Sequence, residues 1–149
     1  MNVDLVVLSL GGVQRFISES RTTADVANSS LIIQHLAVKA AHAIRGRLAE
    51  PEELIFPALP EPGDGVTSKI AFLARAGRGP ALAAATGEVV TAEWRAMAME
   101  CFDAEKGTPG FPDVSWVSVT GSPHNFERHC GSAPPNLVLL AAVHGFSMA

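Results

Sequence analysis

The feature that most constrains the fold is the apolar run Val3–Leu10, which stops at Gly11-Gly12 and is followed at once by a different pattern. A run this short and this rich in Val and Leu predicts a buried strand, and a pair of glycines is a typical end to one. From Val13 onward, apolar residues recur at helical spacing as far as about Leu48. The domain therefore opens with a strand that leads directly into helical structure.

The polar passage Arg21–Ser30, RTTADVANSS, predicts a break or kink in this helical stretch. Asn28 or Ser29 could cap the segment that follows, because their side chains can accept hydrogen bonds from the first unpaired amides of a helix. A second helical segment would then run to about Leu48.

The rest of the chain alternates the same two patterns. Glu53–Leu59 is apolar but contains Pro57, so it suits an edge strand or a strand that ends early. Ser68–Ala76 returns as a strand, Pro80–Lys106 repeats apolar residues at helical spacing, and Val114–Gly121 is strand-like in composition. This order predicts an α+β, ferredoxin-like βαββαβ fold, with the helices on one face of an antiparallel sheet.

The length of 149 residues fits a single domain, which we assign to residues 1–121. The pattern fails after Gly121: residues 122–149 begin polar and end in an apolar run without an assignable partner. We therefore expect a closing segment or an irregular, poorly packed C-terminal tail.

Charge and cysteine content narrow the function. The net charge of −4 provides no global basic field for a nucleic acid, and only the first 48 residues carry more basic than acidic side chains. Cys101 and Cys130 are far apart and belong to no paired motif, which points to reduced thiols and the cytoplasm. The run Val3–Leu10 is too short to span a bilayer, so neither a signal peptide nor a membrane segment is expected.

Three groups of residues are candidates for a site. The Gly11-Gly12 turn before a helix is either plain turn geometry or a place where backbone amides approach a phosphate. Arg21 and Asp25 are four apart, a spacing that favours an ion pair over a phosphate contact by Arg21. The third group is His124, His129 and Cys130, whose residue types are those of zinc ligands. The sequence offers no second cluster that would complete the four ligands of a zinc site.

No nucleophile with its base and no paired catalytic carboxylates stand out. Two-metal phosphoryl transfer needs carboxylates that hold the metal ions against the attacking and leaving oxygens. Where the first strand ends, this chain has Ser9 and Gly11, and Asp4 lies near the strand's beginning. We therefore predict no catalytic residue and no metal site in this chain.

The stretch LGGVQRFISESRTTADVANSSLI resembles the opening of the first palm domain in the large, polymerase-like subunit of type III CRISPR effector complexes. The resemblance continues in LIFPAL and in the helix with EWRAM, and covers about residues 3–120. Gly12, Ala24, Ala27 and Ser29 depart from the usual Pro, Arg, Trp and Gly. The matching positions are Val13, Gln14, Phe16, Ile17, Arg21, Thr23, Asp25 and Ser30, followed by Ile55-Phe56-Pro57.

This resemblance implies a role in RNA-guided antiviral defence. In relatives, two palms together bind ATP and join it into cyclic oligoadenylates, and the second palm carries a Gly-Gly-Asp-Asp metal site that is missing here. The implied partners are the other effector subunits and a second palm that supplies magnesium, with guide and target RNA contacted only indirectly; no membrane is implied. The implied nucleotide-binding residues are Gly11, Gly12, Gln14, Arg21 and Ser30.

Two further expectations follow. The chain should not catalyse nucleotide cyclisation alone. Where relatives continue into an Arg-rich helix, this chain is apolar, which suggests truncation or a frame change near His129, with a designed chain end as the alternative. The alternative function is a stand-alone ferredoxin-like domain that binds a nucleotide or another small molecule.

Overall fold

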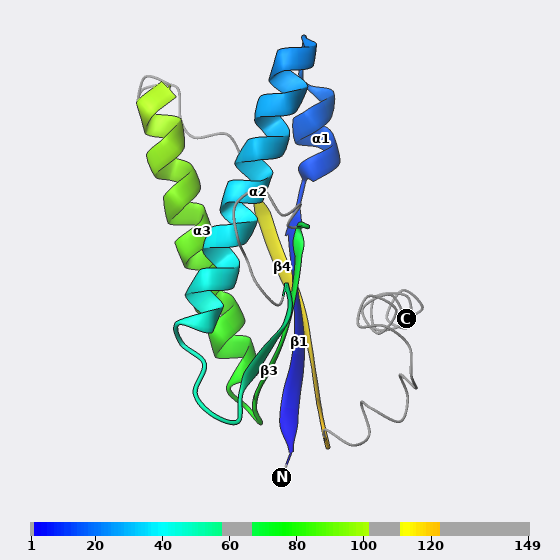
Figure 1. The fold of residues 1–149 in the computed structure, drawn as a ribbon, viewed down its shortest axis with the longest axis vertical. Coiled ribbons are helices and arrows are strands. Elements are labelled where there is room, and N and C mark those ends of the chain that lie inside the picture. The colour runs from blue at the N-terminus through cyan, green and yellow to red at the C-terminus, as the bar shows by residue number, and fades with distance from the viewer. Residues whose placement is uncertain (1, 58–66, 102–110, 123–149) are drawn as a thin grey trace.

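The computed structural model describes residues 2–57, 67–101 and 111–122 (Figure 1). The predicted pattern of strands and helices is present, with the first helical stretch divided in two. The elements are β1 (Val3–Gly11), α1 (Val13–Ser18), α2 (Thr23–Arg45), β2 (Glu53–Phe56), β3 (Lys69–Arg75), α3 (Gly79–Cys101) and β4 (Asp113–Gly121).

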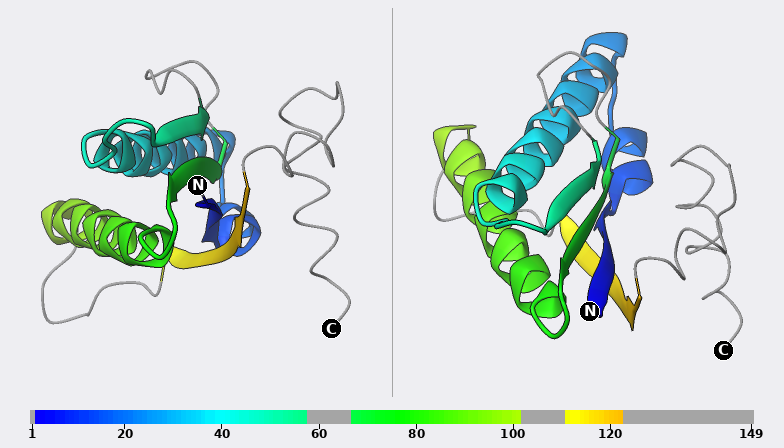
Figure 2. Two further views of the ribbon diagram at one scale, coloured as in Figure 1. Left: turned by 90° about the horizontal axis from the view of Figure 1, so that it is seen from below. Right: turned by 60° about the horizontal axis from the view of Figure 1, so that its bottom comes forward.

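The four strands form one antiparallel sheet in the order β2-β3-β1-β4. β1 lies in the middle, where Val6 pairs with Phe72 of β3 and with Ser118 of β4. The long helices α2 and α3 lie side by side on one face of this sheet (Figure 2). Strand order, strand direction and the single helical layer confirm the predicted ferredoxin-like α+β fold.

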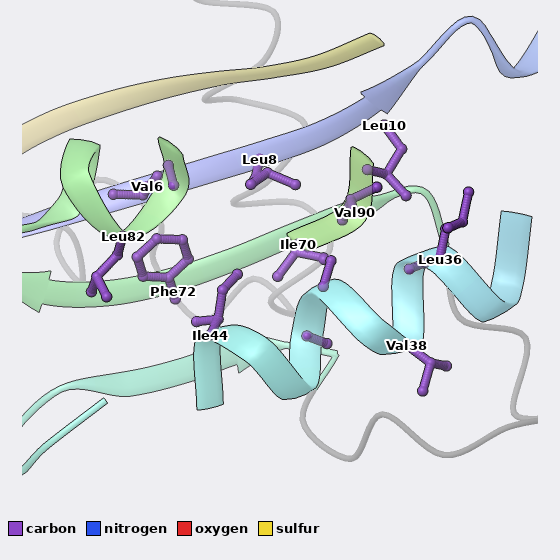
Figure 3. Packing of buried hydrophobic residues seen from close by; sticks show 14 of the residues in the cluster. Val6, Leu8, Leu10, Leu36, Val38, Ile44, Ile70, Phe72, Leu82 and Val90 are labelled. Atoms are coloured by element: carbon purple, nitrogen blue, oxygen red, sulfur yellow. The ribbon is translucent and has the colours of Figure 1, made fainter. Parts of the chain in front are cut away.

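The core lies between this sheet and the two helices (Figure 3). Alternate residues of β1 point toward the helices, because side chains alternate between the faces of a strand, and Val6, Leu8 and Leu10 are at most 2% exposed. Phe72 of β3 and Ile44 of α2 are fully buried beside them. This core thus explains the apolar residues at alternate positions of β1.

The ends of two strands follow the sequence closely. β2 ends at Phe56, immediately before Pro57, and forms one edge of the sheet, as its proline predicts. β1 extends one residue beyond Leu10 to Gly11. Of the predicted tail, residues 122–149, all but the first residue lie outside the described residues. The zinc candidates His124, His129 and Cys130 also lie outside them, as do positions 58–59 and 102–106 of two predicted elements.

The predicted helix cap is wrong. α2 begins at Thr23 and is capped by Thr22, so Asn28 and Ser29 lie inside the helix. Thr22 Oγ1 accepts a hydrogen bond of 3.1 Å from the Asp25 amide, and Asp25 Oδ2 accepts one of 3.0 Å from the Thr22 amide. This reciprocal capping box satisfies two backbone donors, whereas an Asn or Ser cap would satisfy one and would shorten the helix.

Thr22→Ala is expected to lower the free energy of unfolding by about 1 kcal/mol, because it removes the capping oxygen. Thr23→Ala is the matched control: Thr23 is the first residue of α2, is exposed and has no capping role. Urea unfolding followed by circular dichroism measures both. Equal losses in the two variants would contradict the role of Thr22.

None of the helices in the described parts of the chain is long and apolar enough to cross a membrane.

Candidate functional site

The turn between β1 and α1 is shaped by two glycines. Gly11 ends β1 and pairs with Asp113, the first residue of β4. Gly12 has φ = 79°, a left-handed conformation that residues with a Cβ adopt at a cost. A Cβ at Gly12 would also lie 3.4 Å from Cδ2 of Phe111. Glycine at this turn therefore serves both the backbone conformation and the close packing against an aromatic ring.

Three aromatic rings pack together beside this turn. Phe16 of α1 stacks on Phe111, which precedes β4, with ring centroids 4.4 Å apart and an angle of 7° between the planes. The Trp94 ring of α3 meets both edge-on, with centroids 5.7 Å from Phe16 and 5.3 Å from Phe111. These contacts attach the short helix α1 to α3 and fix the geometry of the sheet end where β1 stops.

An open cleft of about 990 Å³ lies between α1 and α3 at this end of the sheet. Figure 1 shows α1 beyond the end of β1, at the same end of the molecule as the C-terminal half of α3. The cleft is lined by Gly12, Arg15, Phe16 and Glu19 on the α1 side, by Thr91, Trp94 and Arg95 on α3, and by residues 111–113.

The charged side chains of the cleft differ in their partners. Arg15 Nε of α1 lies 3.3 Å from Oε1 of Glu19, the residue that caps the C-terminus of α1, and both side chains are exposed. Arg95 is exposed on α3 and forms no ion pair with another residue in the described ranges. Arg95 is therefore the arginine of the cleft that has no carboxylate within ion-pair distance among the described residues.

Asp113 adds a carboxylate that we did not predict at the end of β1. A Cβ built on Gly11 would lie 3.7 Å from Asp113 Oδ2, so the acid stands directly beside the strand end. It comes from β4 by cross-strand pairing, which the spacing of residues along β1 cannot show. The predicted adjacency of the first and last strands of a ferredoxin-like sheet is the signal that would have found it.

The predicted site residues are only partly gathered in this cleft. Gly12 lines the cleft and Gly11 precedes it, whereas Gln14 is exposed on α1 and does not line it. Arg21 is exposed in the link between α1 and α2. The Ser30 hydroxyl donates a 3.1 Å hydrogen bond to the carbonyl of Val26 within α2.

The predicted ion pair between Arg21 and Asp25 is replaced by a backbone contact. The Arg21 amide donates to Asp25 Oδ2 over 3.2 Å, and the same carboxylate serves the cap of α2. The guanidinium of Arg21 is in no ion pair with the described residues. The spacing of four misleads here because Arg21 precedes the helix rather than lying within it.

The carboxylate of Asp4 lies at the other end of β1 and is buried. It accepts hydrogen bonds from the amides of Gly77 and Gly79, so it has a structural position away from the cleft. Within residues 2–57, 67–101 and 111–122, no group of three or more His, Cys, Asp or Glu side chains is placed to hold a metal ion.

Comparison of the sequence with known protein families gives a match. The family model described as CRISPR-associated protein Cmr2, N-terminal, matches residues 5–114. No curated protein and no solved structure matches the chain significantly. The family match starts in β1, ends in β4 and includes every residue that lines the cleft. The chain therefore belongs to the Cmr2 N-terminal family, which identifies it with the large subunit of type III CRISPR effector complexes.

Proposed function

We propose that the chain is a palm module of a type III CRISPR RNA-guided antiviral effector and contributes part of an ATP site. The observation that carries this proposal is the family match over a ferredoxin-like domain whose central strand ends at a glycine turn and a cleft. The cleft volume lies in the range of small-molecule sites, roughly 300–1,000 Å³. Its aromatic and cationic side chains suit the base and the phosphates of a nucleotide.

The chain's own residues support binding rather than catalysis. Two-metal phosphoryl transfer needs several carboxylates that clamp the attacking and leaving oxygens. Two carboxylates line the cleft, Glu19 and Asp113, of which Asp113 lies beside the end of β1. Magnesium and its further ligands would come from a second palm, and joining of ATP into cyclic oligoadenylates would require both palms.

The proposed partners are the other subunits of the effector complex and this second palm. The net charge of −4 provides no global attraction for a polynucleotide, so guide and target RNA would be contacted through those subunits. A nucleotide, by contrast, needs only a local cluster of suitable side chains.

Gly12→Val is expected to weaken ATP binding by the assembled large subunit about tenfold or more, because its side chain would narrow the cleft beside Phe111. Titration calorimetry with ATP and magnesium measures this. The isolated chain should bind weakly or undetectably.

Gly77→Val is the matched control for backbone strain. Gly77 has a similar φ of 83°, yet a Cβ there would meet no atom within 4 Å and the residue is not part of the cleft. Both variants should lose stability to a similar degree, and only Gly12→Val should lose ATP affinity. If Gly12→Val keeps the wild-type affinity, the Gly11-Gly12 turn takes no part in ATP binding. Tight ATP binding by the isolated chain would favour a stand-alone binding domain instead.

A further inference from the structure

The structure offers two places for the phosphates of a nucleotide in this cleft: the glycine turn and the wall formed by α3. The turn is the weaker of the two. α1 has only six residues, so few aligned peptide dipoles stand behind its first amides. The Asp113 carboxylate beside Gly11 would also repel a phosphate placed at the end of β1.

The α3 wall provides Arg95. α3 spans 23 residues and is anchored at this point by Trp94, which is 5% exposed and packs on the rings of Phe16 and Phe111. Arg95 follows Trp94 directly and therefore starts from a rigid backbone. Arg15, the other arginine of the cleft, already has the carboxylate of Glu19 beside it.

We propose that Arg95 binds the phosphate groups of the nucleotide, while the base lies against the stacked pair Phe16 and Phe111. A guanidinium offers paired N–H donors that match phosphate oxygens. Aromatic rings can stack with any nucleobase, because every base has a flat π face. This assignment rests on the proposed ATP site and moves its phosphate contact from the Gly11-Gly12 turn to a side chain of α3.

Arg95→Gln tests the assignment in the assembled large subunit with ATP and adenosine as probes. We expect ATP affinity to fall about tenfold or more and adenosine affinity to stay within about twofold, because only the phosphates lose their partner. Calorimetry measures ATP, and ligand-observed NMR follows the weaker adenosine. Arg45→Gln is the control: it removes the same charge from an exposed position in the last turn of α2, outside the cleft.

The outcomes separate this assignment from the proposed function. If the wild-type complex binds ATP and Arg95→Gln binds it equally well, the phosphates lie elsewhere and the ATP site stands. Equal losses of ATP and adenosine would give Arg95 a role in cleft shape and overturn the phosphate contact. A wild-type complex that binds no ATP would overturn the ATP site itself.

Phe111→Leu tests the position of the base independently. It keeps an apolar side chain beside Gly12 but removes the ring that stacks on Phe16. ATP and adenosine affinities should then fall by the same factor. Unchanged adenosine affinity would place the base away from this pair.

Discussion

Replacing Asp4 with Ala is expected to lower the free energy of unfolding by about 3–4 kcal/mol, a large loss for one substitution. The side chain is only 1% exposed. Its Oδ2 accepts hydrogen bonds from the amides of Gly77, at 2.7 Å, and Gly79, at 3.0 Å. Its Oδ1 accepts one of 2.7 Å from the Thr120 hydroxyl. A single carboxylate of β1 thus holds both β4 and the turn that begins α3.

The tight packing around Asp4 leaves little room for another acceptor to replace its carboxylate. A Cβ at Gly79 would lie 2.6 Å from Cγ2 of Val6 and 2.8 Å from Cβ of Asp4, so the start of α3 packs tightly onto β1. An amide that loses its acceptor in such a place is left buried and unsatisfied. The carboxylate also stabilises α3 electrostatically, because its negative charge lies beside the positive, N-terminal end of this long helix.

Urea unfolding at neutral pH measures the effect, and two further variants show how much of it comes from individual hydrogen bonds of Asp4. Thr120→Val removes one partner and should cost about 1 kcal/mol. Asp4→Asn keeps the shape but replaces one acceptor oxygen with a donor, so its loss should lie between those of Thr120→Val and Asp4→Ala. An Asp4→Ala loss smaller than that of Thr120→Val would contradict the proposed role.

The elements that the sequence predicts well are those whose cause is local. β1 is a short apolar run with glycines after it, and the structure ends it at Gly11. β2 ends where Pro57 removes a backbone donor. The order of these elements leaves few ways to bury both helices on one sheet, which is why the ferredoxin-like arrangement could be predicted.

The cap of α2 was missed although its cause is equally local. Thr22 and Asp25 are three residues apart, the spacing of a capping box. Asn28 and Ser29 are also good capping residues, and residue preference alone does not rank these alternatives. The reciprocal pair of hydrogen bonds decides in favour of Thr22, because it satisfies two donors and adds turns to the helix.

The cleft could not be read from the sequence because its walls are far apart in the chain. Gly12 and Asp113 come together through the pairing of β1 with β4. Arg95 joins them only because Trp94 packs on Phe16 and Phe111. The resemblance identified Gly12 and the helix that carries Trp94 and Arg95, but the juxtaposition is a property of the fold.

Glu52 is a second buried acid whose role depends on tertiary contacts, and Glu52→Ala is expected to cost about 2–3 kcal/mol. The side chain is 1% exposed. Its carboxylate accepts hydrogen bonds from the amides of Arg75, at 3.0 Å, and Ala49, at 2.9 Å, and from the guanidinium of Arg78. It thereby joins the segment before β2 to the end of β3 and the start of α3.

Glu53→Ala is the control for this variant. Glu53 is the next residue in the chain, carries the same charge and is exposed. Its replacement should change the free energy of unfolding by less than about 0.5 kcal/mol. Similar losses in the two variants would mean that charge, rather than the buried contacts of Glu52, accounts for the effect.

The stabilisation by Glu52 should also depend on pH. Burial alone would raise the pKa of Glu52, but the amides of Arg75 and Ala49 and the guanidinium of Arg78 outweigh it and lower the pKa below 4.5. Because the folded state then binds a proton less readily than the unfolded state, the stabilisation is present above about pH 4.5 and is lost as the pH falls through the lower, folded value.

Glu52→Gln, which cannot titrate, isolates this dependence. The difference in unfolding free energy between wild type and Glu52→Gln should be largest near neutral pH and shrink below about pH 4.5. The pKa of Glu93 is also lowered, by its hydrogen bond to His35, but this group titrates in both proteins and cancels in the difference. A difference that stays constant from neutral to acidic pH would show that Glu52 acts through its shape and not through its charge.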